Sequence, residues 1–174
     1  MRLKAGSLNL GGSIIADGLG GNCCWQWGGS GGGVRIEVAG AITGTGNVYA
    51  RGGSVNSQSG GGGRIAIYYG TGTFDSTHAV ASGRENTGQA GTVYIKNPGQ
   101  QYGNLTFDNA GQTASTSNTR ATLLTLPGSA GQQNFDNLFV LRWAQVYSPD
   151  VLNVLGTVHV DSNARLQSAN YNLP

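Results

Sequence analysis

Residues 33–38 read Gly-Val-Arg-Ile-Glu-Val, and the pattern returns as Gly-Gly-Arg-Ile-Ala-Ile at 62–67 and as Gly-Thr-Val-Tyr-Ile at 91–95. Apolar side chains occupy every second position in each copy, which is the pattern of a strand with one buried face. A second repeat relates residues 5–18 to residues 39–52, which lie 34 positions later. Repeats of this length are typical of stacked units that cannot bury a core alone.

This repeat predicts an all-β fold, a right-handed parallel β-helix (β-solenoid). Equivalent strands of successive units would pair in parallel, about 4.8 Å apart, joined by right-handed crossovers. The first apolar run of each unit predicts an inner ladder of Val34, Ile65 and Val93. The inner positions predicted for the second run are Ile14 and Ala16, Val48 and Ala50, Ala79 and Ala81, and Leu105 and Phe107.

Glycine-rich loops separate the copies at residues 18–33, 52–63 and 83–91. The loops vary in length while the strands do not, so we expect the loops on one side of the solenoid. Glycine becomes scarce after Gly131. We therefore expect a single domain over 1–174, with long glycine-rich coils over 1–112 and shorter coils over 113–174. Because the repeat already includes Ala5, the chain is expected to be part of a longer protein with neighbouring domains.

Composition narrows the set of partners. The chain contains 31 glycines, ten Lys and Arg, and eight Asp and Glu, for a net charge of +2. The basic residues are scattered from Arg2 to Arg165, so we expect no nucleic-acid partner. No apolar run approaches the length of a spanning helix, so no membrane span is expected. Few charges beside many neutral polar residues indicate an extracellular or cell-surface location.

Three segments carry a resemblance to a known kind of protein. They are residues 61–69 (Gly-Gly-Gly-Arg-Ile-Ala-Ile-Tyr-Tyr), 91–96 (Gly-Thr-Val-Tyr-Ile-Lys) and 102–109 (Tyr-Gly-Asn-Leu-Thr-Phe-Asp-Asn). Together they resemble the glycine-rich β-helical repeat modules of large secreted or cell-surface bacterial proteins, which are adhesin-like. The resemblance covers roughly residues 30–110 and implies a β-helix beside adhesion or sugar-binding modules. It names no catalytic residue.

The first candidate site is the loop at residues 18–33. Trp25 and Trp27 lie two positions apart there, and two indoles can stack on the apolar face of a pyranose ring. Gln26 and Asn22 would add neutral hydrogen bonds to sugar hydroxyls. The loop carries no charge between Gly18 and Gly33, so binding would be largely independent of salt. The alternative is that the indoles cover the open end of the solenoid or pack on a neighbouring loop.

Cys23 and Cys24 are adjacent and are the only cysteines. Three interpretations stay open: two thiols, a vicinal disulfide that stiffens the loop, and intermolecular pairing or metal binding. An oxidising compartment favours the disulfide. A metal would need further Cys or His ligands, and the loop has none, so no metal ligand is assigned.

The second candidate site is the outer face of the strands. The alignment of the copies places Arg35 beside Arg64, and Glu37 beside Ala66 and Tyr94. Such a face is either a binding groove, as in β-helical polysaccharide enzymes, or a solvated sheet face with balanced charges. The second repeat also predicts that Asp17 and Arg51 pair across adjacent coils.

No catalytic residue and no cofactor is predicted, apart from a structural Ca²⁺ in a turn at Asp108-Asn109 or Asp136-Asn137. The sequence thus predicts a non-catalytic extracellular module, structural or carbohydrate-binding, whose partner is a polysaccharide or cell-surface glycan. The alternative is a polysaccharide-active enzyme, a lyase or glycoside hydrolase, with a shallow β-helix groove. Its candidate residues would be Arg35, Glu37, Arg64 and Tyr94.

Overall fold

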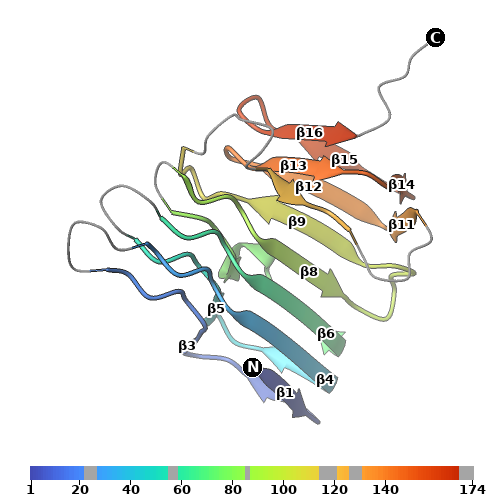
Figure 1. Cartoon of the computed structure of the whole chain (residues 1–174). Coiled ribbons are helices and arrows are strands. Elements are labelled where there is room, and N and C mark those ends of the chain that lie inside the picture. Colours follow the sequence, from blue (N-terminus) through green and yellow to red (C-terminus); the bar gives the residue numbers. More distant parts are fainter. Residues whose placement is uncertain (22–26, 55–58, 85–86, 114–120, 126–130, 169–174) are drawn as a thin grey trace.

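A computed structural model describes residues 1–21, 27–54, 59–84, 87–113, 121–125 and 131–168. The chain folds as the repeat predicts, into stacked coils of a right-handed parallel β-helix (Figure 1). The helix that lies wholly within the described residues is a single 3₁₀ turn, η1 (Ser76–His78).

One sheet, called here the shared sheet, runs the whole length of the solenoid. Its strands lie side by side in Figure 1, in the order in which they occur along the chain. They are β1 (Arg2–Ala5), β4 (Gly33–Thr43), β6 (Arg64–Gly72), β8 (Thr92–Lys96), β9 (Asn104–Asp108), β12 (Asn137–Leu141) and β15 (Val158–Val160), with β2 (Leu8–Asn9) paired to β4.

The N-terminal coils close against a second, three-stranded sheet of β3 (Ser13–Ile15), β5 (Asn47–Tyr49) and β7 (Ala79–Val80). The predicted inner ladder is confirmed, because Val34 lies opposite Ile65 and Ile65 opposite Val93. These three side chains are buried in one apolar core. Burial of each such side chain stabilises the fold by roughly 1.5–3 kcal/mol.

The glycine-rich loops stack on one another at one corner of these coils, as predicted. The amide of Gly53 donates to the carbonyl of Gly29 at 2.8 Å, and that of Gly31 donates to Gly61 at 2.9 Å. A Cβ on Gly53 would lie 2.0 Å from the carbonyl oxygen of Leu19. The backbones therefore approach too closely for any other residue at this position.

The direction of the shared sheet reverses between β8 and β9, which are antiparallel (Figure 1). Tyr94 lies directly opposite Leu105, and residues opposite each other in an antiparallel pair point to the same face. Tyr94 points away from the N-terminal core, whereas Leu105 is buried in the C-terminal core. The two cores therefore lie on opposite faces of the shared sheet.

This reversal corrects one prediction. Leu105 and Phe107 belong to β9 of the shared sheet and do not continue the ladder of Ile14, Val48 and Ala79. Alternation of apolar residues is the same in parallel and antiparallel strands, so the pattern could not reveal the change of direction.

The C-terminal coils are three-sided and shorter. Leu138 lies opposite Val158, 20 residues further on, whereas Arg2 and Arg35 in the first coils are 33 residues apart. Two smaller sheets form the other two sides of these coils. One consists of β10 (Thr122–Leu123), β13 (Gln145–Ser148) and β16 (Arg165–Ser168), and the other of β11 (Gln132–Phe135) and β14 (Val151–Val154). At β8–β9 the strand direction reverses, and the core moves to the opposite face of the shared sheet. Because the two changes occur together, the C-terminal coils wind in the same right-handed sense as the N-terminal coils, which is the sense that crossovers favour.

Asn109 joins the two halves at the reversal. Its side chain is fully buried, its Oδ1 accepts the amide of Gly83 at 2.8 Å, and its Nδ2 donates to the carbonyls of Gln112 at 2.7 Å and Gly88 at 3.3 Å. One amide side chain thus satisfies backbone groups from both sets of coils.

Candidate functional site

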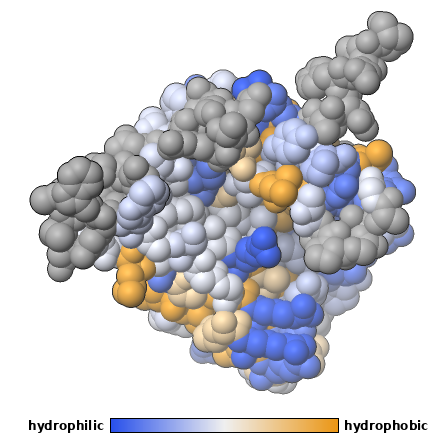
Figure 2. Space-filling model, in the orientation of Figure 1, coloured by the Kyte–Doolittle hydropathy of each residue, from blue (hydrophilic) through white to orange (hydrophobic). Residues whose placement is uncertain are grey.

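The outward side chains of β1, β4, β6 and β8 form one face of the molecule, called here the basic face. Each coil places its outward residues beside those of the coil before it, so residues far apart in sequence meet here. The face comprises Arg2, Lys4, Arg35, Glu37, Arg64, Tyr68, Tyr94 and Lys96. Figure 2 shows hydrophilic side chains gathered over the end of the sheet that holds β1 and β4.

The predicted register of this face is wrong by two residues. Arg35 lies opposite Ala66 rather than Arg64, and Glu37 lies opposite Tyr68 rather than Ala66. A shift of two residues keeps every side chain on its own face of a strand, because the side-chain period is two. The four predicted residues therefore share one face, but Arg35 and Arg64 are not direct neighbours.

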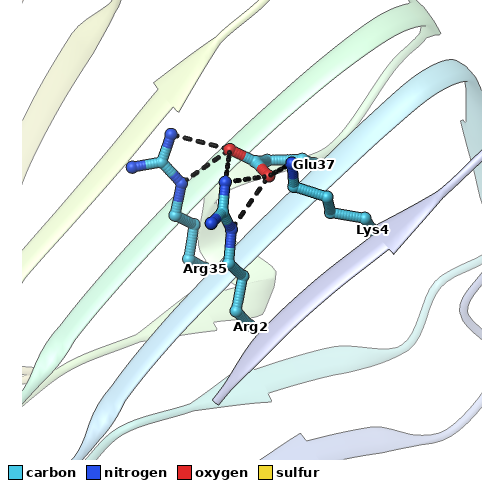
Figure 3. A network of polar contacts seen from close by, with 4 residues as sticks. All are labelled: Arg2, Lys4, Arg35 and Glu37. Carbon is cyan, nitrogen blue, oxygen red and sulfur yellow. Dashed lines mark hydrogen bonds and ion pairs between the residues drawn. The ribbon is translucent and has the colours of Figure 1, made fainter.

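Glu37 is the centre of an ionic network (Figure 3). Its carboxylate lies 2.7 Å from Nη2 of Arg35, 3.0 Å from Nη2 of Arg2 and 3.5 Å from Nζ of Lys4. Desolvation alone would raise the pKa of Glu37, but hydrogen bonds and charge from Arg35 and Arg2 outweigh it and hold this pKa below its usual range. Glu37 is therefore ionised at neutral pH and has no proton to donate as a general acid.

Two tyrosines continue the basic face beyond this network. The guanidinium of Arg35 lies 4.9 Å from the ring centre of Tyr68, and the rings of Tyr68 and Tyr94 lie 5.5 Å apart at 51°. The hydroxyl of Tyr94 donates to the carbonyl of Tyr102. Burial, with a smaller effect of Tyr68, raises the pKa of Tyr94 to about 12, so it keeps its proton at neutral pH.

Tyr68 was missed in the sequence, although the alternation of residues 64–68 places it outward. Only the observed register sets it directly beside Glu37 and Lys96.

The basic face is hollowed along its length. A shallow groove of about 840 Å³ runs past Lys4, Arg35, Glu37, Tyr68 and Lys96. A cleft of about 830 Å³ continues from Tyr68 and Lys96 to the point where the C-terminal coils cover the same side of the sheet. The cleft is lined by Arg64, Tyr94 and Tyr102 on the sheet side, and by Leu123, Gln133 and Phe135 on the wall side.

Most of the predicted loop site lies outside the described residues, namely Asn22, Cys23, Cys24, Trp25 and Gln26. Trp27 is described and is 76% exposed. Its indole is therefore accessible for stacking. The paired platform of Trp25 and Trp27, like the redox state of the cysteines, stays a prediction.

Asp17 and Arg51 pair across adjacent coils, as predicted. Arg51 Nη2 lies 2.6 Å from Asp17 Oδ2, and the Arg51 amide donates to Asp17 Oδ1 at 2.7 Å. The Arg51 guanidinium also lies 4.2 Å from the ring centre of Tyr49. This pair, at the end of the β3–β5 ladder, repeats the Arg–Tyr contact of Arg35 and Tyr68 outside the basic face.

The turns considered for calcium are held by protein contacts. Asp108 pairs with Arg142, and Asp136 Oδ2 accepts the amide of Gly103 at 2.7 Å. Asn137 Oδ1 accepts the amide of Thr157 at 2.9 Å. The described residues contain no group of three acidic, His or Cys side chains that could hold a metal ion. Calcium binding at these turns stays a prediction.

Comparison of the chain with protein-family models, curated proteins and solved structures gives no significant match. The likeness to adhesin-like modules therefore rests on the sequence pattern, and the structure supports its β-helical architecture. No helix in the described part of the chain is long and apolar enough to cross a membrane.

Proposed function

We propose that this chain is a non-catalytic, extracellular carbohydrate-binding module of a secreted or cell-surface bacterial protein, and that it binds an extended glycan along the basic face. One observation carries the proposal: the coils bring two tyrosines and five cationic side chains to one face, along which a groove and a cleft cross several strands.

The shape of the site favours a polymer. Small molecules are bound in pockets that enclose most of their surface. The groove beside Tyr68 instead stays open and leads into the cleft at Tyr94. A glycan chain can lie along such a groove, with sugar rings against the tyrosines and hydroxyls bonded to guanidinium groups.

The protonation states favour binding over catalysis. A general acid or base works best with a pKa near the operating pH. The pKa of Glu37 lies below its usual range and that of Tyr94 is about 12, so neither group readily exchanges a proton at neutral pH. A lyase or hydrolase that uses either group as its general acid or base is therefore the weaker candidate.

The test is a binding and turnover screen against soluble polysaccharides. We expect affinity without turnover, and a loss of about fivefold in Tyr68→Ala, if sugar stacking contributes about 1 kcal/mol, the lower end of the roughly 1–3 kcal/mol known for a base on an aromatic ring. Tyr49→Ala is the matched control, because Tyr49 also lies against an arginine but outside the groove. Turnover that is lost in Glu37→Gln would establish the enzyme instead.

Trp27→Ala separates the two candidate sites within the same screen. If the loop binds the glycan, this variant loses affinity while Tyr68→Ala keeps it. Silence on every glycan would leave a structural spacer as the function.

A further inference from the structure

We propose that the basic face selects an acidic polysaccharide, whose sugar units bear carboxylate or sulfate groups, and that Glu37 is a built-in competitor for that ligand. This inference rests on the proposed glycan-binding function and names the class of glycan.

The charge of the chain is unevenly distributed. The outward positions of the described strands β1, β4, β6 and β8 hold five cations, Arg2, Lys4, Arg35, Arg64 and Lys96, and a single carboxylate, Glu37. The chain as a whole has ten Lys and Arg against eight Asp and Glu. The remainder thus has five cations and seven carboxylates and is net negative, so the positive charge is concentrated on the basic face.

The cations are placed in a repeating array. Arg2 lies directly opposite Arg35 on the neighbouring strand, and strands are spaced about 4.8 Å apart. This spacing is close to the length of one pyranose unit in an extended chain. Like charges directly opposite each other destabilise a sheet, so the Arg2–Arg35 pair needs an anion between its side chains.

Glu37 supplies that anion in the free protein. Its carboxylate accepts hydrogen bonds from Nε and Nη2 of Arg2 and from Nε of Arg35, and it lies near the ammonium group of Lys4. The network of four side chains still carries two net positive charges, and the side chains of Arg2 and Arg35 are about half exposed. Each guanidinium has five donors, so both arginines have N–H groups left for a ligand.

Further along the groove, Arg64 and Lys96 have no carboxylate partner within the described part of the chain. Lys96 Nζ donates to the carbonyl of Gln101 at 2.6 Å, which positions the ammonium group without neutralising it. A ligand with anions at intervals along its length would contact the Glu37 network at one end and these two cations at the other.

The aromatic geometry favours a sugar over a nucleic acid. Binding of single strands relies on open aromatic faces on which successive bases stack. The rings of Tyr68 and Tyr94 are tilted by 51° against each other, so the pair offers no parallel platform for two successive bases, whereas a sugar ring needs only one aromatic face.

The role of Glu37 leads to an unusual expectation. Replacing Glu37 by Gln removes the competing charge and frees three cations. We expect affinity for an acidic polymer to rise about three- to fivefold, the effect of one exposed ion pair. Affinity for a neutral polymer should not change. Asp17→Asn removes a carboxylate from an ion pair outside the basic face and is the matched control.

The experiment compares polygalacturonate with its fully methyl-esterified form, which has the same backbone without the charge, by calorimetry at 50 and 200 mM salt. We expect binding to polygalacturonate to weaken about tenfold or more as salt rises, because ion release drives polyanion binding. At either salt concentration, Arg35→Gln and Arg64→Gln should bind polygalacturonate more weakly than the wild type. Circular dichroism checks that every variant is folded.

The outcomes separate the two proposals. If neither polymer binds, the proposed function fails and this inference with it. If both bind equally and without salt dependence, glycan binding stands and the choice of an acidic ligand is wrong. If Glu37→Gln weakens polygalacturonate binding, Glu37 is a ligand-binding group and not a competitor. An oligonucleotide that binds as tightly as polygalacturonate of equal charge would overturn the choice of polysaccharide.

Discussion

Tyr94 and Leu105 lie directly opposite each other across β8 and β9, so an outward residue of the N-terminal coils shares a face with a core residue of the C-terminal coils. Here the basic face ends, because the C-terminal coils cover the sheet from this point on. The wall of the cleft is thus a direct consequence of the reversal in strand direction.

The reversal should depend on Asn109. Asn109→Ala leaves the buried Gly83 amide, the buried Gly88 carbonyl and the partly buried Gln112 carbonyl without their partner. Each buried unsatisfied group costs about 1–3 kcal/mol, so we expect a loss of at least about 2 kcal/mol in the free energy of unfolding, measured with urea. Asn153→Ala, which removes one partly buried bond to Asn134, should cost less than about 1.5 kcal/mol. Equal losses in both variants would contradict this role.

The inner ladder should tolerate no charge. Ile36 and Ile65 are 0% and 1% exposed, so Ile36→Asp or Ile65→Asp buries a carboxylate without a partner. Both variants should lose cooperative thermal unfolding, measured by circular dichroism. Arg64→Ser, whose side chain points outward from the same strand as Ile65, should keep it. A cooperative transition in either Asp variant would show that these positions are not core.

The cost of replacing a glycine by alanine should differ sharply between the stacked loops and the strands. Gly53→Ala would place a Cβ 2.0 Å from the Leu19 carbonyl oxygen, whereas a Cβ at Gly33 has open space around it. We expect Gly53→Ala to destabilise the fold by about 1–3 kcal/mol or more, as overpacking does. Gly33→Ala should be neutral or stabilising by up to about 1 kcal/mol, because it restricts the unfolded chain. Urea unfolding of both variants measures the difference, and a Gly53→Ala protein as stable as the wild type would argue against the stacked loops.

Acid should weaken the Asp17–Arg51 pair. Partial burial would raise the pKa of Asp17, but hydrogen bonds and charge from Arg51 outweigh it and hold this pKa below the ordinary value of 3.8. A lowered folded-state pKa stabilises the protein above the unfolded-state value, and this stability is lost as pH falls through the folded-state value. Asp17→Asn should therefore reduce stability by up to about 1 kcal/mol at pH 7 and by less at pH 2. The same loss at both values would mean that the pair does not act through its charge.

Several features followed from the sequence by itself. The ladder Val34–Ile65–Val93 came from alternation, the corner of stacked loops from the position of the glycines, and the Asp17–Arg51 pair from the 34-residue repeat. Each of these depends on a short-range pattern of residues that recurs in adjacent coils.

Other features were decided only by the tertiary structure. Alternation with a period of two cannot distinguish a register from one shifted by two residues, so the neighbours of Arg35 and Glu37 were misassigned. It also cannot distinguish parallel from antiparallel pairing, so the return of Leu105 and Phe107 to the shared sheet was not foreseen.

The basic face shows the same limit most clearly. Arg2, Arg35 and Arg64 are about 30 residues apart in the chain and read as scattered charges. Because a solenoid coil has nearly that length, stacking brings them to one face, as the register of β1, β4 and β6 shows. Sequence patterns determined which side of each strand a residue occupies, whereas strand pairing across coils decided which charges meet.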